Sequence, residues 1–412
     1  MNKQRAISVL QINTTANWGS TGRIAEEIGQ LVVSQMAIKC GWKSYIAYGR
    51  GNPKSKSKLI HIGNDLDMKC HALQSRLFGN HGLASKQVTR TFIKQIDSIK
   101  PDIVHLHNIH GYYLNYEILF DYLAQLDIPI VWTLHDCWAF TGHCAYYSYV
   151  GCNRWRTLCH DCPQKKSYPS SWFADRSEQN FRDKLHAFTS VRNMTLVPVS
   201  AWLAEEVRLS FLKDYPIQVI HNGIDTDVFS PKQICKSNLG LKDKFMILGV
   251  ASVWETRKGL DDFIKLRKLL SDDYSIVLIG LDEKQIKQLP KGIIGIRRTN
   301  SIQDLVAYYS VADAYFNPTW EDNFPTTNLE SLSCGTPVIT YHTGGSVEAV
   351  DERTGFVVEQ GNIAEVANIV EFIKEMGKEH WTFVCRERAR NLYDKKERYM
   401  EYLHLYEKVV SL

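Results

Sequence analysis

The sequence predicts an α/β protein built from two doubly wound, Rossmann-like domains that face each other across a cleft. Three observations favour this fold. The chain has 412 residues, which is more than a single hydrophobic core usually serves. Short apolar runs alternate with amphipathic stretches, as in parallel sheets covered by helices. This alternation occurs twice, and the second series begins near residue 245.

The first series starts with an apolar strand at 6–13, a loop that contains glycines and a helix beginning near Arg23. Further strands are predicted from apolar runs at 44–49, 59–63, 101–107 and 129–135. We assign residues 1–199 to an N-terminal Rossmann-like domain. Residues 200–232 are predicted as a linker region, because the turn-forming stretch HNGID and Pro231 interrupt the pattern there.

The second series predicts a C-terminal Rossmann-like domain at residues 233–377. Its strands are expected at 245–252, 274–280, 292–297, 313–318, 336–340 and 355–359. Its helices are expected at 259–270, 301–311, 326–334 and 362–377. The tail, residues 378–412, has a charged and aromatic helical pattern, and we expect it to pack back on the N-terminal domain.

Composition narrows the function classes. Hydrophobic residues make up 44% of the chain and charged residues 23%, which is typical of a soluble protein. The net charge of +4 is small for this length and gives no sign of nucleic-acid binding. No stretch is long enough to span a bilayer, and the N-terminus lacks the apolar core of a signal peptide. We therefore expect a cytoplasmic protein, whose ten cysteines are reduced or metal-bound.

Three segments, two that contain glycine and one that is basic, lie where a phosphate would bind. Gly19 lies in the loop before the first helix, where free amides attract anions. Arg257 and Lys258 lie between a strand and a helix, and Gly344 and Gly345 follow another strand. Each glycine segment alone is equally consistent with an ordinary turn, and Arg257 and Lys258 alone would more often be solvated charges at a helix start. A dinucleotide fingerprint is absent, which argues against a nicotinamide enzyme.

Two carboxylates are predicted at the same rim of the second domain. Asp322 follows the strand at 313–318, and Glu330 lies on the next helix. The carboxyl ends of parallel strands share one edge of a sheet, so both acids should lie near Lys258. A carboxylate accepts hydrogen bonds, which suits the hydroxyl groups of a sugar or a ribose. Either acid alone would more often be a charge at a helix start.

These residues resemble the signature of the family 4 retaining glycosyltransferases, which have the GT-B fold. In that family two acidic residues with seven between them precede a run of small residues and the motif GxPVI. Asp322 and Glu330 have this spacing, and GTPVI follows at 335–339. The likeness covers nearly the whole chain in element order. Asp322 stands where the family usually has Glu, and Glu321 precedes it.

The resemblance implies that residues 1–199 form the acceptor-binding domain and that residues 233–377 form the nucleotide-sugar-binding domain, which carries the donor site. By it, Glu330 binds the ribose, Asp322 binds the transferred sugar and Lys258 binds the diphosphate. The other implied donor-site residues are Gly19, Arg257, Asn323, Phe324, Pro325, Gly344 and Gly345. The family's arginine, about six residues before the lysine, is missing: Ser252 and Val253 occupy that region, and Arg257 is the candidate substitute.

The resemblance also implies roles for histidines. His135 would point at the transferred sugar, and His107 and His110 would contact the acceptor. Together with His105 they also suggest a metal site, but alternate residues of a strand point to opposite faces, so acceptor contacts or packing are favoured. A front-face retaining mechanism fits, with Lys258 stabilising the departing diphosphate. No metal or other cofactor is required for this chemistry.

A segment rich in cysteine, about 137–170, interrupts the first domain. Cys144, Cys152, Cys159 and Cys162 include one CxxC, and four thiolates suffice for a structural zinc ion. His143 or His160 could replace a cysteine. Free cysteines and disulfides are the alternatives, and the segment could also line the acceptor pocket.

The family resemblance further implies a hexosyltransferase of bacterial cell-surface polysaccharide biosynthesis. Its donor would be UDP- or GDP-linked, and its acceptor a saccharide or a lipid-linked saccharide. Residues 75–96 mix basic and apolar side chains and predict either a solvated basic helix or a peripheral contact with the inner face of the membrane. A nucleotide-sugar epimerase and a non-catalytic partner that binds nucleotide-sugars are the alternative functions.

Overall fold

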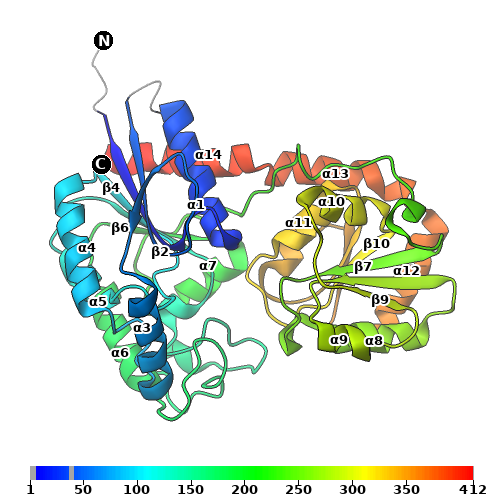
Figure 1. Ribbon diagram of the computed structural model, residues 1–412, viewed down its shortest axis with the longest axis horizontal. Helices are drawn as coiled ribbons and strands as arrows, with labels where there is room; N and C mark the ends of the chain where they lie inside the picture. Colours follow the sequence, from blue (N-terminus) through cyan, green and yellow to red (C-terminus); the bar gives the residue numbers. More distant parts are fainter. Residues whose placement is uncertain (1–5, 37–40, 412) are drawn as a thin grey trace. The chain divides into compact units, whose positions relative to one another are not determined.

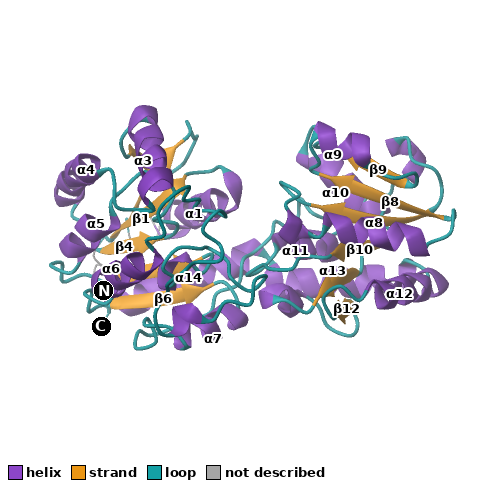
Figure 2. Ribbon diagram, turned by 90° about the horizontal axis from the view of Figure 1, so that it is seen from below, coloured by secondary structure: helices purple, strands orange, loops and turns teal. Residues whose placement is uncertain are grey.

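The computed structural model describes residues 6–36 and 41–411 (Figure 1). The chain divides into two compact units. The first comprises Met1–Ile220 together with Tyr399–Leu412, and the second comprises His221–Arg398. In each unit, helices surround a central sheet (Figure 2). This confirms the predicted α/β class.

The sheet of the first unit has six parallel strands in the order β3-β2-β1-β4-β5-β6. The strands are β1 (Ser8–Thr15), β2 (Lys43–Arg50), β3 (Lys58–His61), β4 (Ile103–Leu106), β5 (Ile130–Leu134) and β6 (Met194–Pro198). The order reverses between β1 and β4, where Val9 is opposite Ile103. Open parallel sheets bind ligands at the carboxyl ends of the strands beside such a reversal.

The helices of the first unit are α1 (Gly19–Leu31), the π-helical η1 (Val32–Met36), α3 (Asp65–Phe78), α4 (Lys86–Ile99), α5 (Tyr116–Leu123), α6 (Ser177–Phe188) and α7 (Ala201–Arg208). Several begin with a polar cap. Asn64 accepts hydrogen bonds from the amides of Leu66 and Asp67 at the start of α3, and Ser200 caps α7. The long segment between β5 and α6 contains only two short 3₁₀ turns, η2 (Trp138–Phe140) and η3 (Arg154–Arg156).

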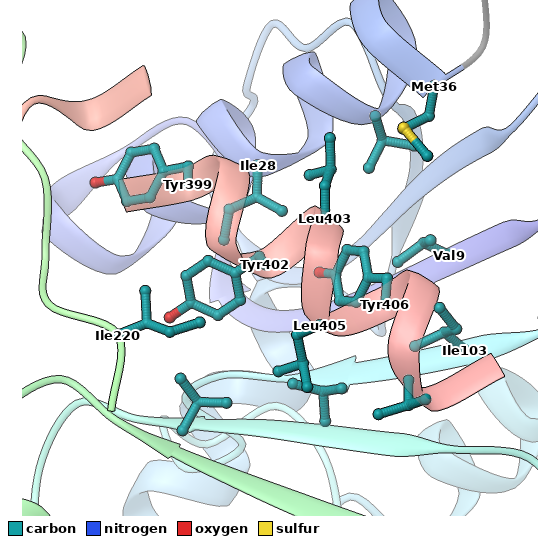
Figure 3. Close-up of a cluster of buried hydrophobic side chains, with 14 of the residues drawn as sticks. Val9, Ile28, Met36, Ile103, Ile220, Tyr399, Tyr402, Leu403, Leu405 and Tyr406 are labelled. Carbon is teal, nitrogen blue, oxygen red and sulfur yellow. The ribbon is translucent and has the colours of Figure 1, made fainter. Parts of the chain in front are cut away.

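The end of the chain completes the core of the first unit. Helix α14 (Lys395–Val410) carries Tyr402, Leu403 and Tyr406, which are almost completely buried. Figure 3 shows these side chains beside Val9 of β1 and Ile28 of α1. A large apolar area is thus removed from water by a segment almost 400 residues from β1, so the N-terminal sheet depends on the C-terminal helix for its stability.

The sheet of the second unit repeats this topology, in the order β12-β11-β10-β7-β8-β9. All of its strand pairs are parallel. The strands are β7 (Phe245–Val250), β8 (Tyr274–Ile279), β9 (Ile293–Ile296), β10 (Ala314–Asn317), β11 (Val338–Tyr341) and β12 (Gly355–Val358). The order reverses between β7 and β10, so the loops after these two strands meet at one edge.

The helices of the second unit are α8 (Leu260–Leu269), α9 (Glu283–Gln288), α10 (Ile302–Val311), α11 (Thr326–Ser333), α12 (Ile363–Met376) and α13 (Glu379–Tyr393). Three 3₁₀ turns, η4 (Lys236–Leu239), η5 (Thr256–Lys258) and η6 (Gly344–Ala349), lie in loops. Helix α9 is absent from the predicted elements because its six residues give too short a pattern.

The described boundaries differ from the predicted ones in three places. Helix α1 begins at Gly19 and not near Arg23. The first unit continues to Ile220, through α7 and the chain that follows it. The tail divides between the units, because α13 packs against α11 of the second unit whereas residues from Tyr399 onward belong to the first.

Candidate active site

The loops after β7 and β10 bring the predicted lysine and carboxylate into contact. Lys258 lies in η5, and its Nζ is 2.5 Å from Oδ2 of Asp322. The two side chains are only 21% and 16% exposed. A partly desolvated ion pair at this edge offers a cation to an anionic group and a carboxylate to hydroxyl groups.

Gly259 allows these two loops to approach. It has φ +74°, and a Cβ at this position would lie 2.3 Å from the carbonyl oxygen of Pro318. The amide of Trp320 also donates a hydrogen bond to the carbonyl of Arg257, at 2.7 Å. The Lys258–Asp322 contact is therefore fixed by backbone packing as well as by charge.

Arg257 has protein partners in this structure. Its Nε is 3.0 Å from Oε2 of Glu255, and its Nη1 donates to the carbonyl of Glu321 at 3.3 Å. These contacts hold the guanidinium beside the loop after β10. Its role as a substitute for the family's arginine stays a prediction.

Glu330 lies on α11, and its Oε2 accepts a hydrogen bond of 2.8 Å from the hydroxyl of Tyr309. Burial and the neighbouring Glu330 carboxylate raise the pKa of Tyr309 well above its usual value, so the phenol remains a donor. This bond fixes one carboxylate oxygen of Glu330 and orients the other.

A network of buried polar side chains that we did not predict supports the same edge. Asn317 donates to Asn328 at 2.8 Å, and Asn328 in turn donates to the hydroxyl of Ser346 at 3.1 Å. Ser346 also bonds Thr340 at 2.6 Å. The network joins the end of β10, helix α11 and the turn that begins at Gly344. The signal in the sequence was a polar residue at or next to the end of each of two apolar strands, Asn317 in β10 and Thr340 in β11.

The remaining predicted donor residues lie around this network. Asn323 and Phe324 are buried, and the ring of Phe324 is 4.8 Å from that of His221. Pro325 is the residue before α11. Gly344 begins η6 with a positive φ of 48°, which favours glycine, and Gly345 is buried beside it.

The loop between β1 and α1 and the first turn of α1 contain two glycines, Gly19 and Gly22, whose surroundings differ. Gly19 has φ +67°, and a Cβ there would meet no atom within 4 Å. At Gly22 a Cβ would lie 2.5 Å from Oγ1 of Thr15. Gly22 is therefore required for packing of α1 against β1, whereas Gly19 leaves open space at the helix start, where a ligand could approach.

His107 and His135, which follow β4 and β5, form a hydrogen-bonded pair with Nδ1 of His107 3.2 Å from Nε2 of His135. The other nitrogen of His107 is 3.0 Å from Oε1 of Gln11. Because Gln11 uses its amide nitrogen to bond Ala25, its oxygen is the acceptor, and His107 carries its proton on Nε2. His135 then donates from Nε2. Burial lowers the pKa of His135 to about 4, so both rings are neutral near pH 7.

His110 is paired with a carboxylate that we did not predict. Its Nε2 is 2.9 Å from Oδ2 of Asp136, and its Nδ1 is 3.0 Å from the hydroxyl of Tyr168. Burial would raise the pKa of Asp136, but His110 and the amide of Trp138 hold it below its usual value. A pocket of about 190 Å³ is lined by His107, His110, His135, Asp136 and other residues after β4 and β5.

His105 lies apart from this pocket. Its two ring nitrogens bond the hydroxyls of Tyr406, at 2.5 Å, and Thr133, at 2.8 Å. It therefore ties helix α14 to the sheet and acts in packing.

The four cysteines of the predicted zinc site line one pocket of about 270 Å³, together with His143 and His160. Nε2 of His143 is buried and has no hydrogen-bond partner among the described residues. However, the described part of the chain holds no group of three or more His, Cys, Asp or Glu side chains arranged to hold a metal ion. These four cysteines form no disulfide bonds in the structure. Zinc binding stays a prediction.

Within residues 75–96, Lys86, Arg90 and Lys94 are exposed along α4, whereas Leu83 and Phe92 are buried. Phe78, at the end of α3, is 60% exposed. A peripheral contact of this segment with a membrane stays a prediction. Among the described residues, none of the helices is long and apolar enough to cross a membrane.

Two family models match the chain. The model described as "Glycosyltransferase Family 4" matches residues 69–228, and the model described as "Glycosyl transferases group 1" matches residues 244–374. The matches fall largely in the first and second unit respectively, and together they span most of the chain.

Curated relatives are similar at low identity. The chain is 24% identical to WcaC of Escherichia coli (strain K12), named as a glycosyl transferase of colanic acid biosynthesis, over 97% of this chain and 100% of WcaC. It is 26% identical to the Campylobacter jejuni N,N'-diacetylbacillosaminyl-diphospho-undecaprenol alpha-1,3-N-acetylgalactosaminyltransferase, over 50% of this chain and 58% of that protein.

Solved structures share the fold. The sucrose-phosphate synthase of Thermosynechococcus elongatus superposes with a TM-score of 0.71 at 15% identity, covering 98% of this chain and 99% of that one. HepE of Anabaena, solved in complex with UDP, gives a TM-score of 0.66 at 13% identity, covering 98% of this chain and 100% of that one. The sheets, the acidic pair and the family matches agree: the chain belongs to the group 1 and family 4 glycosyltransferases, which are retaining enzymes of the GT-B fold.

Proposed function

We propose that this glycosyltransferase moves a hexose from a UDP- or GDP-linked donor to a saccharide or lipid-linked saccharide in the assembly of a cell-surface polysaccharide. The proposed donor site rests on the Lys258–Asp322 ion pair, which lies where the strand order of the second sheet reverses. Glu330 lies on α11, the helix that follows Asp322. The name of WcaC supports the polysaccharide product, and that of the Campylobacter transferase supports a lipid-linked acceptor. HepE, which has the same fold, was solved with UDP.

In the proposed reaction, the bond between the sugar's anomeric carbon and the diphosphate oxygen breaks. The acceptor oxygen bonds the same carbon from the same face, and its proton passes to the leaving diphosphate oxygen. Lys258 stabilises the negative charge on that diphosphate, because a cation in a partly desolvated site is aimed at charge that develops in the transition state. Asp322 and Glu330 bind hydroxyls of the donor.

We would test the donor site by thermal shift against UDP, GDP and ADP, followed by turnover of the matching nucleotide-sugars. A ligand that binds the folded state raises the melting temperature by mass action. We expect one nucleotide to give a shift that Lys258→Ala removes.

Lys396→Ala is the matched control, because Lys396 forms an ion pair with Asp227 on the exposed surface of the second unit, where both side chains are more than 60% exposed. A shift that survives in Lys258→Ala, or is lost equally in Lys396→Ala, would contradict the assignment of Lys258 to the diphosphate.

A further inference from the structure

Five aromatic rings of the first unit gather beside the His110–Asp136 pair. We call this group the aromatic box. Its members are His81, His110, Tyr112, Trp138 and Tyr168. His81 follows α3, and His110 and Tyr112 follow β4. The other two residues, Trp138 and Tyr168, come from the cysteine-rich segment at about 137–170. Of the five, only His110 was a predicted site residue.

The rings of the aromatic box contact one another mostly edge to face. The ring of His81 is 5.1 Å from that of Tyr112 and 5.9 Å from that of Tyr168. The ring of Tyr168 is 5.8 Å from that of His110. His81 also accepts a hydrogen bond of 2.8 Å from Nε1 of Trp138. These contacts hold the rings at fixed angles, as in a preformed site.

One wall of the box faces solvent. Tyr168 is 47% exposed and Tyr112 is partly exposed, while His81, His110 and Trp138 are buried. Tyr168 also bonds the only ring nitrogen of His110 that Asp136 does not use. A hydroxyl group of a ligand could therefore replace the Tyr168 hydroxyl at Nδ1 of His110.

Arg50, at the end of β2, supplies a donor at the same place. Its Nη2 bonds the carbonyl of Gly111 at 3.3 Å, and its charge acts on both Tyr112 and Tyr168. Its Nε is buried and has no hydrogen-bond partner among the residues that the structure describes. An unsatisfied buried donor costs free energy, which a ligand oxygen would recover.

The backbone beside the box is strained. Tyr112 has φ +70°, a conformation that side-chain-bearing residues rarely adopt. Gly111, which precedes it, has φ +117°. Such conformations persist where surrounding contacts enforce them, and they concentrate at ligand sites.

We propose that the aromatic box is a binding subsite for one saccharide unit of the acceptor. The C–H face of the sugar ring packs on Tyr168 and Tyr112, because the ring faces of aromatic side chains are electron-rich. Sugar oxygens accept from Arg50, and a sugar hydroxyl donates to Nδ1 of His110. Asp136 is then a positioning residue, since it fixes which nitrogen of His110 carries the proton. This inference rests on the proposed glycosyl transfer and adds the part of the molecule that selects the acceptor.

The test is saturation-transfer NMR of the full chain, with UDP or GDP present, whichever gives the thermal shift, and four monosaccharides as probes: D-glucose, D-galactose, L-fucose and D-glucuronate. We expect at least one sugar to receive saturation. Tyr168→Ala and Arg50→Gln should each weaken its binding about five- to ten-fold. Phe173→Ala is the matched control, because Phe173 is a 72% exposed aromatic residue of the same segment outside the box.

A second measurement follows the hydrogen bonding of the His110 ring. In protein labelled with ¹⁵N-histidine, the bound sugar should shift the Nδ1 resonance of His110, and Asp136→Asn should abolish that response while the protein stays folded. The proposal is overturned if none of the four sugars receives saturation, or if Phe173→Ala weakens binding as much as Tyr168→Ala. The thermal-shift screen separates the two failures. No shift with UDP, GDP or ADP in wild type rejects the donor function, whereas nucleotide binding without sugar binding rejects only the aromatic box.

Discussion

Protein groups hold the candidate donor-binding side chains before any ligand binds. Lys258 has Asp322 as its partner, and Glu330 has the hydroxyl of Tyr309. A charged group that already has one fixed partner loses less conformational entropy when it binds a ligand, so such contacts preorganise a site. The cost is that the diphosphate must compete with Asp322 for Lys258.

Glu330→Gln should weaken nucleotide binding with little change in folding. The amide oxygen of Gln can still accept from Tyr309, but hydrogen bonds to a charged carboxylate are about twice as strong as those to a neutral acceptor. We expect the dissociation constant for the nucleotide to rise about ten-fold, or about 1.4 kcal/mol. Isothermal titration calorimetry would measure this.

Tyr309→Phe tests the hydrogen bond at one oxygen of the Glu330 carboxylate separately from its charge. It removes the bond at Oε2 while keeping the Glu330 charge. Nucleotide affinity should then fall by less than in Glu330→Gln. Equal affinities in wild type and Glu330→Gln would show that Glu330 does not contact the ribose.

Short loop elements set the positions of Lys258 and Gly344, whereas Glu330 lies on the regular helix α11. η5 delivers Lys258, and η6 begins at Gly344. η5 follows β7, one of the two strands at the reversal of strand order, and η6 follows β11, which pairs with the other, β10. Gly259, after η5, and Gly344, at the start of η6, both have a positive φ. A sequence pattern with a period of 2 or 3.6 residues carries no information about such turns.

Gly259→Ala should be more destabilising than Gly240→Ala. Both glycines have φ near +70°, so both substitutions incur the cost of a left-handed conformation, about 1 kcal/mol. At Gly240 a Cβ meets no atom within 4 Å, whereas at Gly259 it would lie 2.3 Å from the carbonyl oxygen of Pro318. Urea unfolding should show at least about 1–3 kcal/mol of additional loss for Gly259→Ala. Nucleotide binding should fall in Gly259→Ala alone.

The cysteine segment allows a direct test of zinc. If the four thiols bind it, elemental analysis of purified wild type should find about one zinc per chain, as a four-coordinate structural site requires. Cys159→Ser should lose that metal, and Cys235→Ser should keep it, because Cys235 is an exposed cysteine of the other unit. Metal-free wild type that is folded would show that packing alone orders the segment.

The two units differ in the histidines they bury. The described residues include six buried histidines, and all belong to the first unit: His71, His81, His105, His107, His110 and His143. Burial lowers the pKa of His71 and His143 to about 4 and that of His105 to about 3. In the unfolded chain these groups titrate near 6.5, so between these values the unfolded state binds more protons than the folded state.

The stability of the first unit should therefore be greatest above pH 6.5 and fall as the pH decreases toward 4. Each such histidine lowers the free energy of unfolding by up to about 1.4 kcal/mol per pH unit in that window. Urea titrations at pH 7.5, 6 and 5 would measure the slope. His71→Asn should reduce it, because Asn can still bond Ser85, as His71 does through Nδ1, but does not titrate. An unchanged slope in His71→Asn would show that His71 does not contribute.

The sequence alone determined the architecture of both units. All six strands of the second sheet and five of the six strands of the first were predicted from apolar runs, because strands buried on both faces read as continuous apolar segments between polar loops. Strand β6 was not among the predicted strands. The acidic pair and Lys258 were found in the same way, since residues that follow parallel strands must meet at one edge. Spacing along the chain is sufficient where topology fixes proximity.

Tertiary structure alone decided which polar groups are partners. Tyr309 bonds Glu330, Asp136 bonds His110 and Tyr406 bonds His105, and in each case the partners are distant in sequence or lie in loops without a period. The same applies to Tyr168, which reaches His110 from an irregular segment. Burial penalises any unpaired polar atom, but many residues could satisfy it, so only the packed fold selects the partner.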